Sequence, residues 1–263
     1  MKKKQPRIII WDIETSEMIV KSWGLWNQNI NHKSIVQDWN IICISWKVLG
    51  KKKVKTFSVD FNKSRFDDYD LCKNMREVLL GADAIVHHNG NAFDLKKFTS
   101  RLIKHSLNPL PPILCIDTLK EVRKIAKFSS NTLDYIGTHL GLGSKLETGG
   151  QGLWNGVRDG DPKALQLMIK YCEQDVLLLE QVYLKLRGYM KSHPNLTLDA
   201  SSIRNLTLDG DNITCPKCGS HKKHGHGYRR SASGILSQQI QCQGCYGYYT
   251  LRMSEKEKPK TKN

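Results

Sequence analysis

The hydrophobic and polar positions in the first part of the chain predict three strands. The β-branched run Ile8–Ile10 predicts a buried first strand over Arg7–Asp12. Alternating apolar positions predict two more strands at Ile41–Val48 and Val54–Val59. Because the connections are short, we expect the three strands to form an antiparallel meander. A segment with three tryptophans separates the first two strands and is expected to form a loop or hairpin insertion.

Further along the chain, strand patterns alternate with helical patterns. The predicted elements are, in order, a helix at Phe66–Leu80, a strand at Ala84–His88, a helix at Phe93–His105, a strand at Ile113–Ile116, a helix from Asp117 toward Lys127, a helix at Leu133–Leu140 and a long helix from Pro162 to about Met190. The Gly-rich residues 144–160 are predicted to form a mobile loop. This order predicts an α/β domain whose mixed five-stranded sheet is flanked by helices.

The composition changes after Pro194. Residues 194–213 are rich in Ser, Thr, Asn and Asp, which is typical of a linker. Residues 214–253 carry cysteines and glycines and predict a small module, and the charged residues 254–263 predict a disordered tail. We therefore predict a main domain at residues 1–193, followed by a linker, a C-terminal module and a tail.

The net charge of the chain indicates which class of partner it favours. A formal net charge of +16 over 263 residues favours polyanionic partners, although a well-solvated surface would also account for it. No apolar run approaches the roughly 20 residues that span a membrane, and the apolar run after the N-terminal lysines is too short for a secretory signal. Four cysteines scattered among apolar residues (Cys43, Cys72, Cys115 and Cys172) indicate a reducing compartment. We expect a cytoplasmic protein without membrane contact.

Two carboxylates follow the first apolar run. Residues two apart on a strand point to the same side, so Asp12 and Glu14 share one face at the end of the first strand. Like charges this close repel each other unless a cation lies between them, and oxygen ligands suit Mg²⁺ or Mn²⁺. Taken alone, this short pattern also fits acidic residues that merely reach water.

Two other segments carry candidate site residues. Asp94 follows a turn after the fourth predicted strand, at the strand edge where α/β sheets place their sites, although an ordinary first-turn Asp would have the same pattern. Tyr171 and Asp175 are four residues apart on the long helix and share one face. Asp175 borders an apolar stripe, where a carboxylate is costly to bury without a partner. The alternative is an exposed Asp at the edge of that stripe.

Together these segments resemble the DEDD superfamily of 3′–5′ exonucleases, which have a ribonuclease-H-like fold. The matching motifs are Asp12-x-Glu14, Asn89-x-x-x-Phe93-Asp94 and Tyr171-x-x-x-Asp175. Tyr171 at the third motif is similar to the DEDDy branch, which includes the proofreading domains of DNA polymerases. The resemblance covers residues 6–190, and it depends on all three motifs occurring in this order.

The resemblance implies a two-metal hydrolysis of phosphodiesters that releases 5′-mononucleotides from a 3′ end. By analogy with the family, Asp12 would bridge two Mg²⁺ or Mn²⁺ ions, and Glu14 and Asp175 would complete the site that generates the nucleophile. Asp94 would support the second ion. Tyr171 would orient the attacking water, because a phenol with a pKa near 10 is a poor base at neutral pH.

The expected substrate is single-stranded DNA, bound in part by Thr15, Trp26, Asn89 and Phe93. Trp23, Trp26 and Phe93 are candidates for stacking on a terminal base, although simple packing also accounts for them. The chain has no room for a polymerase domain, so proofreading would require a separate DNA polymerase or other replication protein as partner. The alternatives are an exonuclease that trims RNA 3′ ends, since no residue decides the sugar, and a non-catalytic nucleic-acid-binding or scaffold protein.

The C-terminal module contains two C-x-x-C pairs, Cys215–Cys218 and Cys242–Cys245. Four thiolates at this spacing predict one structural Zn²⁺ in a zinc ribbon. The histidines at 221, 224 and 226 are expected in an exposed loop, because four cysteines make further ligands unnecessary. Basic residues between the pairs and tyrosines after them suit nucleic acid, although zinc ribbons also bind proteins.

Overall fold

The computed structural model describes residues 6–195, 214–230 and 236–252. The chain divides into two compact units. The larger unit comprises Arg7–Lys120 and Phe128–Val182, and the smaller unit includes Glu121–Lys127 and the chain from Tyr183 onward. Residues 196–213 of the predicted linker and the whole predicted tail lie outside the described residues.

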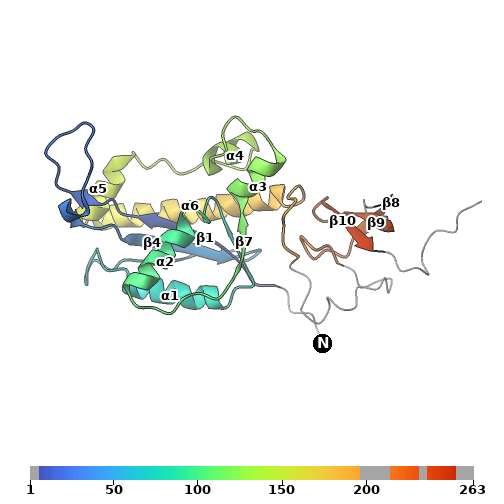
Figure 1. Cartoon of the computed structure of the whole chain (residues 1–263), viewed down its shortest axis with the longest axis horizontal. Helices are drawn as coiled ribbons and strands as arrows, with labels where there is room; N and C mark the ends of the chain where they lie inside the picture. The colour runs from blue at the N-terminus through green and yellow to red at the C-terminus, as the bar shows by residue number, and fades with distance from the viewer. Residues whose placement is uncertain (1–5, 196–213, 231–235, 253–263) are drawn as a thin grey trace, which may run out of the picture. The chain divides into compact units, whose positions relative to one another are not determined.

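The larger unit is built on a mixed five-stranded sheet with the strand order β5-β4-β1-β6-β7 (Figure 1). The central strand pairs antiparallel with β4 on one side and parallel with β6 on the other. The edge strand β5 is antiparallel to β4, and the edge strand β7 is parallel to β6. The strands are β1 (Ile8–Thr15), β4 (Ile41–Val48), β5 (Lys55–Ser58), β6 (Ala84–His87) and β7 (Leu114–Asp117). This arrangement confirms the predicted sheet and meander.

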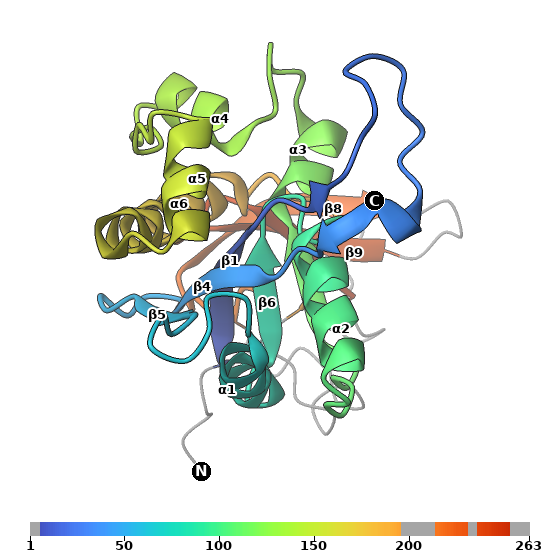
Figure 2. The ribbon, with the colours of Figure 1, turned by 90° about the vertical axis from the view of Figure 1, so that its left-hand side faces the viewer.

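The tryptophan-containing insertion forms a separate small hairpin. Strands β2 (Ile19–Val20) and β3 (Ile35–Gln37) pair antiparallel, with the short 3₁₀ helix η1 (His32–Ser34) before the second strand. The connection between them extends away from the sheet as the blue loop in Figure 2. Within this connection the side chains of Trp23 and Trp26 are 105% and 83% exposed.

Helices cover both faces of the sheet (Figure 2). On one face, α1 (Tyr69–Leu80) and α2 (Asp94–Lys104) pack on alternate residues of β1 and on part of β4. On the other face, α5 (Gln151–Asp159) and α6 (Pro162–Leu186) pack on the remaining residues of β4. The short helices α3 (Thr118–Ile125) and α4 (Leu133–His139) complete the described helices. Both faces of β1 and β4 are therefore buried.

The prediction of a loop over residues 144–160 was wrong in its second half, where α5 forms. The glycines hide a helical pattern in which Leu153 and Val157, four residues apart, are buried against the core. Gly156 permits this packing, because a Cβ there would lie 2.8 Å from the Cβ of Ala164. The helix ends at Gly160, whose φ of 86° favours glycine.

The C-terminal module is a three-stranded antiparallel sheet with the order β10-β9-β8. Its strands are β8 (Lys223–Arg230), β9 (Leu236–Cys242) and β10 (Tyr248–Arg252). His224 and His226 are exposed as predicted, but they lie on β8 instead of in a loop. The four cysteines of the two C-x-x-C pairs come together at one end of this sheet.

Candidate functional site

The pleat of β1 separates core residues from site residues. Ile9, Trp11 and Ile13 belong to the apolar cluster under α1 and α2. Asp12 and Glu14 therefore point to the opposite face of the sheet, where α6 packs. The pairing of β1 with β4 shifts register just after Glu14, as is common beside functional sites.

Helix α6 brings a third carboxylate to this face of the sheet. Its buried residues Met168 and Cys172 pack on the sheet, and the Cys172 thiol donates a hydrogen bond to the backbone oxygen of Asp12 at 3.5 Å. One turn further along, Asp175 is only 1% exposed. One carboxylate oxygen from each of Asp12, Glu14 and Asp175 lies within 4.8 Å of the others. The strand and the helix thus build a compact group of three carboxylates.

Asp94 lies at the first residue of α2 and is 3% exposed. Backbone N–H groups of Asp94 itself and of Ile13 hydrogen-bond to its carboxylate, which ties it to β1 between Asp12 and Glu14. It is not one of the three mutually close residues, yet it is the strongest of the neighbouring charges that raise the pKa of Asp12. Asp94 therefore lies at the edge of the site and influences it through its charge.

The turn that carries Asp94 is held by a residue at the end of β7. The carboxylate of Asp117 accepts hydrogen bonds from the backbone N–H of Asn89 at 3.0 Å and of Asn91 at 3.2 Å. Asn89 has a φ of 65°, a left-handed conformation that asparagine tolerates better than most residues. Gly90 allows close approach, since a Cβ there would lie 2.2 Å from the ring of His87. Asp117 thus fixes the position of the second motif.

Burial raises the pKa of every carboxylate in the site, and neighbouring carboxylates add to each shift. Burial is the largest cause for Asp12, whose pKa lies well above its ordinary value, with Asp94 and Glu14 adding to the shift. Burial followed by the charge of Asp175 raises the pKa of Glu14 to about 8, and burial raises the pKa of Asp94 to about 7. The pKa of Asp175 is also raised by burial. Negative charge therefore dominates the site, and divalent cations, which prefer carboxylate oxygens, would fit it.

Lys145 is a site residue that the sequence pattern did not indicate. Its Nζ donates hydrogen bonds to Asp175 Oδ2 at 2.5 Å and to the Tyr171 hydroxyl at 2.9 Å. Burial opposes its charge, but Asp175 and Tyr171 outweigh burial and raise the pKa of Lys145. In turn its charge lowers the pKa of all four carboxylates. Lys145 stands in the Gly-rich segment outside any helix or strand, where no periodicity marks it.

Trp154 on α5 is a second residue that sequence reasoning missed. Its Nε1 donates a hydrogen bond to the backbone oxygen of Thr15 at 3.2 Å, and its ring contacts that of Tyr171 edge-on at 6.2 Å. Helix α5 therefore links the end of β1 to the third motif. The missed signal is the helical spacing of Leu153 and Val157 around this tryptophan.

The four expected substrate-binding residues lie in different settings. Thr15 engages Trp154 through its backbone, and Asn89 lies in the turn that Asp117 holds. Phe93 precedes α2 and is 40% exposed. Trp26 lies in the connection of the hairpin, 83% exposed. Their roles in binding remain predictions.

The cysteine cluster of the C-terminal module has the dimensions of a metal centre. The sulfur atoms of Cys215 and Cys245 lie 3.7 Å apart, and those of Cys218 and Cys242 lie 3.5 Å apart. Tetrahedral zinc with Zn–S bonds of about 2.3 Å requires sulfur atoms about 3.8 Å apart. The backbone N–H of Gly244 donates to the Cys242 sulfur at 3.2 Å, which supports a thiolate at this position. The donor set and spacing fit zinc.

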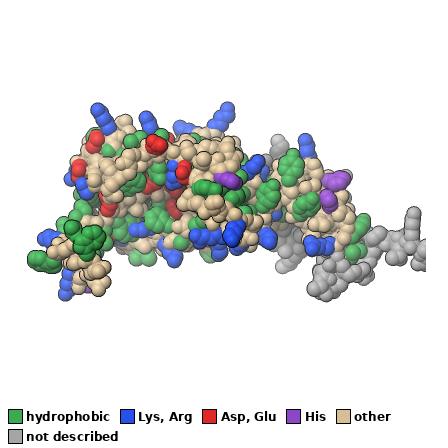
Figure 3. Space-filling view, turned by 90° about the horizontal axis from the view of Figure 1, so that it is seen from above, with side chains coloured by type: hydrophobic (Ala, Val, Ile, Leu, Met, Phe, Trp, Pro, Cys, Tyr) green, Lys and Arg blue, Asp and Glu red, His purple; other side chains and the backbone are tan. Residues whose placement is uncertain are grey.

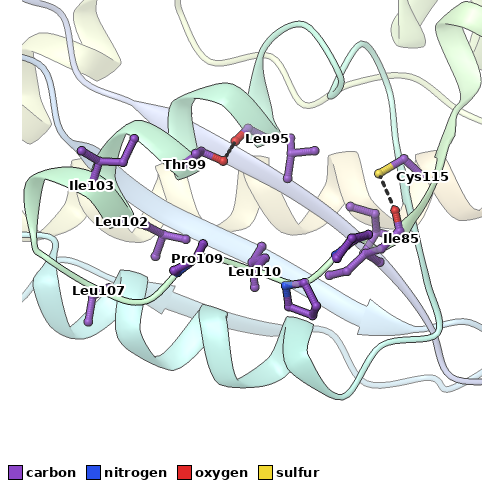
Figure 4. A pocket seen from close by; sticks show the side chains of 12 residues that line it. Ile85, Leu95, Thr99, Leu102, Ile103, Leu107, Pro109, Leu110 and Cys115 are labelled. Atoms are coloured by element: carbon purple, nitrogen blue, oxygen red, sulfur yellow. Dashed lines mark hydrogen bonds between the residues drawn. The ribbon is translucent and has the colours of Figure 1, made fainter.

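A separate cavity of about 550 Å³ lies beside α2 and the Pro-rich segment before β7 (Figure 4). Its lining is almost wholly apolar. The two polar groups drawn in Figure 4 are already used, since the Thr99 hydroxyl donates to the Leu95 oxygen at 2.7 Å and the Cys115 thiol donates to the Ile113 oxygen at 3.3 Å. The cavity offers no convergent polar groups for catalysis.

A family model described as RNase_H superfamily matches residues 32–187, more than half of the chain. The chain belongs to the RNase_H superfamily. The match begins after β1, so Asp12 and Glu14 lie outside the matched residues. The predicted ribonuclease-H-like fold is confirmed.

This RNase_H superfamily chain is also similar to a solved structure, that of the family B DNA polymerase from the hyperthermophilic archaeon Pyrobaculum calidifontis. The TM-score is 0.53 at 16% sequence identity, and the match covers 70% of this chain and 25% of the polymerase chain. At this identity the likeness concerns the fold alone. A comparison with curated proteins finds no match. Among the described residues, no helix combines the length and apolar character needed to cross a bilayer.

Proposed function

We propose that this protein is a metal-dependent 3′–5′ exonuclease of the DEDDy type that removes 5′-mononucleotides from single-stranded DNA. The observation that carries the proposal is the convergence of Asp12, Glu14 and Asp175 within 4.8 Å, with Asp94 coupled to them. Buried carboxylates with raised pKa values and a single lysine as countercharge are expected where divalent cations bind. Membership of the RNase_H superfamily supports a nuclease.

In this proposal each residue has a defined task. Asp12, Glu14, Asp94 and Asp175 would hold two Mg²⁺ or Mn²⁺ ions, which would supply an activated water and neutralise charge on the phosphate. Tyr171 orients the attacking water through its hydroxyl, because burial raises its pKa and keeps it protonated. Lys145 fixes the Tyr171 hydroxyl and the Asp175 carboxylate in one arrangement.

The proposal is tested by digestion of 5′-labelled single-stranded DNA and RNA, each with a free or a blocked 3′ end, in Mg²⁺ or Mn²⁺. We expect a ladder that shortens from the free 3′ end of DNA and no reaction on the blocked strands. A ladder on RNA alone would assign the protein to RNA trimming. Cleavage of blocked strands would exclude an exonuclease, and no cleavage of any strand would leave a nucleic-acid-binding or scaffold role.

We also propose that Cys215, Cys218, Cys242 and Cys245 hold one structural Zn²⁺ that makes the C-terminal module a zinc ribbon. Sulfur separations of 3.7 and 3.5 Å support this assignment. Zinc content measured by native mass spectrometry should be one ion per chain, and Cys218→Ser should reduce it. Because Cys115 lies outside the module, Cys115→Ser is the matched control and should retain zinc. A wild-type protein without zinc would exclude the ribbon.

A further inference from the structure

One face of the three-stranded sheet in the C-terminal module is lined with exposed aromatic and polar side chains. In the strand register, Gln241 of β9 lies between His224 of β8 and Tyr248 of β10, so the three form a row across the sheet. A second row along the same face contains Gln239 and Thr250. The opposite face carries Ile240, which is 3% exposed.

The aromatic side chains of this face contact one another. The His226 ring contacts the Tyr248 ring at 5.3 Å and the His224 ring at 6.0 Å, both steeply inclined. The Tyr248 hydroxyl lies 3.4 Å from His226 Nε2, and the Tyr248 side chain remains 44% exposed. These contacts hold three flat rings together at the surface, where they are open to a ligand.

The charge around this face has a single sign. Residues 214–252 include six Lys and Arg residues and no Asp or Glu. Arg229 of β8 pairs with Ser237 of β9, which places it on the same face as the rings, and it is exposed. In Figure 3 the module presents Lys, Arg and His side chains together with green apolar ones, and no acidic side chain appears on the visible part of it.

We propose that this face, defined by His224, His226, Tyr248, Gln239 and Thr250 and called the ring face, binds single-stranded nucleic acid. Exposed flat rings stack on unpaired bases of any sequence, and basic side chains bind the phosphates. Amide side chains such as Gln239 can hydrogen-bond to base edges. The six basic residues and the absence of acidic residues in this stretch favour a polyanion as the partner, and the exposed rings favour one with unpaired bases.

This binding site goes beyond the proposed exonuclease activity and does not require it. The ring face belongs to the smaller unit, and the carboxylate site belongs to the larger unit. A chain that lacks nuclease activity would still be expected to bind single strands through the ring face. The two proposals can therefore fail separately.

The test measures binding of the full-length, zinc-loaded protein to fluorescein-labelled oligo(dT), oligo(rU) and duplex DNA of about 20 nucleotides by fluorescence anisotropy. Mg²⁺ and Mn²⁺ are left out, so that the carboxylates of the other unit repel phosphates and no strand is cut. We expect both single strands to bind more tightly than the duplex. Binding should weaken with salt, as it does for proteins that displace counterions from phosphates.

Tyr248→Ala should weaken binding to both single strands by about tenfold, because it removes one stacking ring. Tyr248→Phe keeps the ring and should bind like the wild type. The matched control is Tyr189→Ala, which removes a tyrosine that is 73% exposed and lies outside the module sheet. This control should leave binding unchanged.

Two substitutions of opposite charge at Thr250 test the same face without removing a ring. Thr250→Glu should weaken binding and Thr250→Lys should strengthen it, while zinc content stays at the wild-type level in both.

Removal of one basic side chain by Arg229→Ala should reduce the slope of log Kd against log salt by about 0.7. Wild-type affinity in both Tyr248→Ala and Thr250→Glu, or equal binding of duplex and single strands by the wild type, would overturn the proposal. The first outcome would direct the search to a protein partner.

Discussion

The larger unit holds two clusters of buried titratable side chains that differ in their countercharges: the Asp68 group, with Asp68 as its one carboxylate, and the Asp12 group, with four carboxylates. Asp68 is 0% exposed and accepts hydrogen bonds from Arg101 Nε and Nη2, both at 2.7 Å, and from the backbone N–H of Ile41 at 2.8 Å. His105 Nε2 lies 2.5 Å from its other oxygen. Burial alone would raise the pKa of Asp68, but these partners outweigh burial and lower it. In the Asp12 group, Lys145 is the only cation among the described residues that lowers the pKa of the four carboxylates, and the pKa of each is still raised.

This difference in countercharge indicates that the Asp68 group is structural and that the Asp12 group is the candidate catalytic one. Asp68, Cys72 and His105 also bring ligand atoms within 4.8 Å of one another, so proximity alone would suggest a metal there. However, the oxygens of Asp68 are already used by Arg101, by Ile41 and by His105. A fold keeps unpaired buried carboxylates only where their cost is offset by something else, because isolated buried charge is strongly unfavourable. The Asp12 group therefore marks the place where cations would act.

The largest expected effect is on catalysis. Asp12→Asn should lower metal-dependent hydrolysis of single-stranded DNA by about 10³-fold or more, because it removes one of the carboxylates that would hold the cations. Without added Mg²⁺ or Mn²⁺ the same variant should be at least as stable as the wild type, since it relieves repulsion. Digestion rates and thermal unfolding check both parts. Asp70→Asn, at a carboxylate that is 67% exposed, is the control and should leave both unchanged.

The Asp68 group, called the paired group because Arg101 pairs with Asp68, should lose stability instead of activity when its carboxylate is removed. Asp68→Asn should reduce the free energy of unfolding by about 3–5 kcal/mol, because it leaves the buried Arg101 guanidinium without its countercharge. The folded fraction should retain its hydrolysis rate per molecule, since Asp68 does not touch the Asp12 group. Urea unfolding with activity normalised to folded protein measures this. If Asp68→Asn were as stable as the wild type, the paired group would not be the structural element described above.

The carboxylates of the Asp12 group could be predicted from the sequence, because local patterns carry them. The alternation in β1 predicted that Asp12 and Glu14 share a face, and the spacing of Tyr171 and Asp175 predicted one helix face. The antiparallel meander and the mixed sheet were also predicted, from short connections and the alternation of strands with helices. These features depend on neighbours in the chain, which periodicity records.

The other residues of the two groups depend on contacts between residues far apart in the sequence, which local patterns do not reveal. Lys145 reaches Asp175 from a segment without periodicity, and its glycine-rich surroundings predicted a loop in which no single residue stood out. Trp154 was missed for the same reason, since glycines masked α5. The pairing of Asp68 with Arg101 joins residues 33 positions apart, and neither belongs to a recognisable motif. Charge compensation of this kind is visible only once the fold is known.

Cation binding should test the Asp12 group directly. Mn²⁺ at about 100 times its dissociation constant should stabilise the wild type by about 2.7 kcal/mol, because it binds the folded state and not the unfolded chain. Glu14→Gln should reduce this stabilisation, whereas Asp70→Asn should not. Differential scanning calorimetry with and without Mn²⁺ measures the shift in Tm. Equal stabilisation of wild type and Glu14→Gln would place the cation elsewhere.

The two groups should also give opposite responses to pH in the absence of Mg²⁺ and Mn²⁺. The raised pKa values of Glu14, about 8, and Asp94, about 7, mean that the folded state binds more protons than the unfolded chain, so these groups lower stability as pH rises from about 5 to 8. The pKa of Asp68 is lower in the folded protein than in the unfolded chain, so Asp68 stabilises the fold at pH values above its unfolded pKa. This stabilisation is lost as the pH falls through the folded pKa. Glu14→Gln should therefore flatten the fall in Tm between pH 5 and 8. An unchanged fall would show that Glu14 is not the group that titrates.

The smallest expected effect concerns Lys145, the one cation of the Asp12 group. Lys145→Met keeps the length of the side chain but removes its charge, so Asp175 no longer has a competing partner and Mn²⁺ should saturate the site at a lower concentration. Turnover at saturating Mn²⁺ should fall by about tenfold, because Tyr171 loses the hydrogen bond that orients its hydroxyl. Titration of activity with Mn²⁺ separates the two effects. Arg101→Met is the matched change in the paired group and should destabilise the fold without altering the Mn²⁺ concentration at half-maximal activity. If Lys145→Met instead required more Mn²⁺ than the wild type, Lys145 would support the cations and not compete with them.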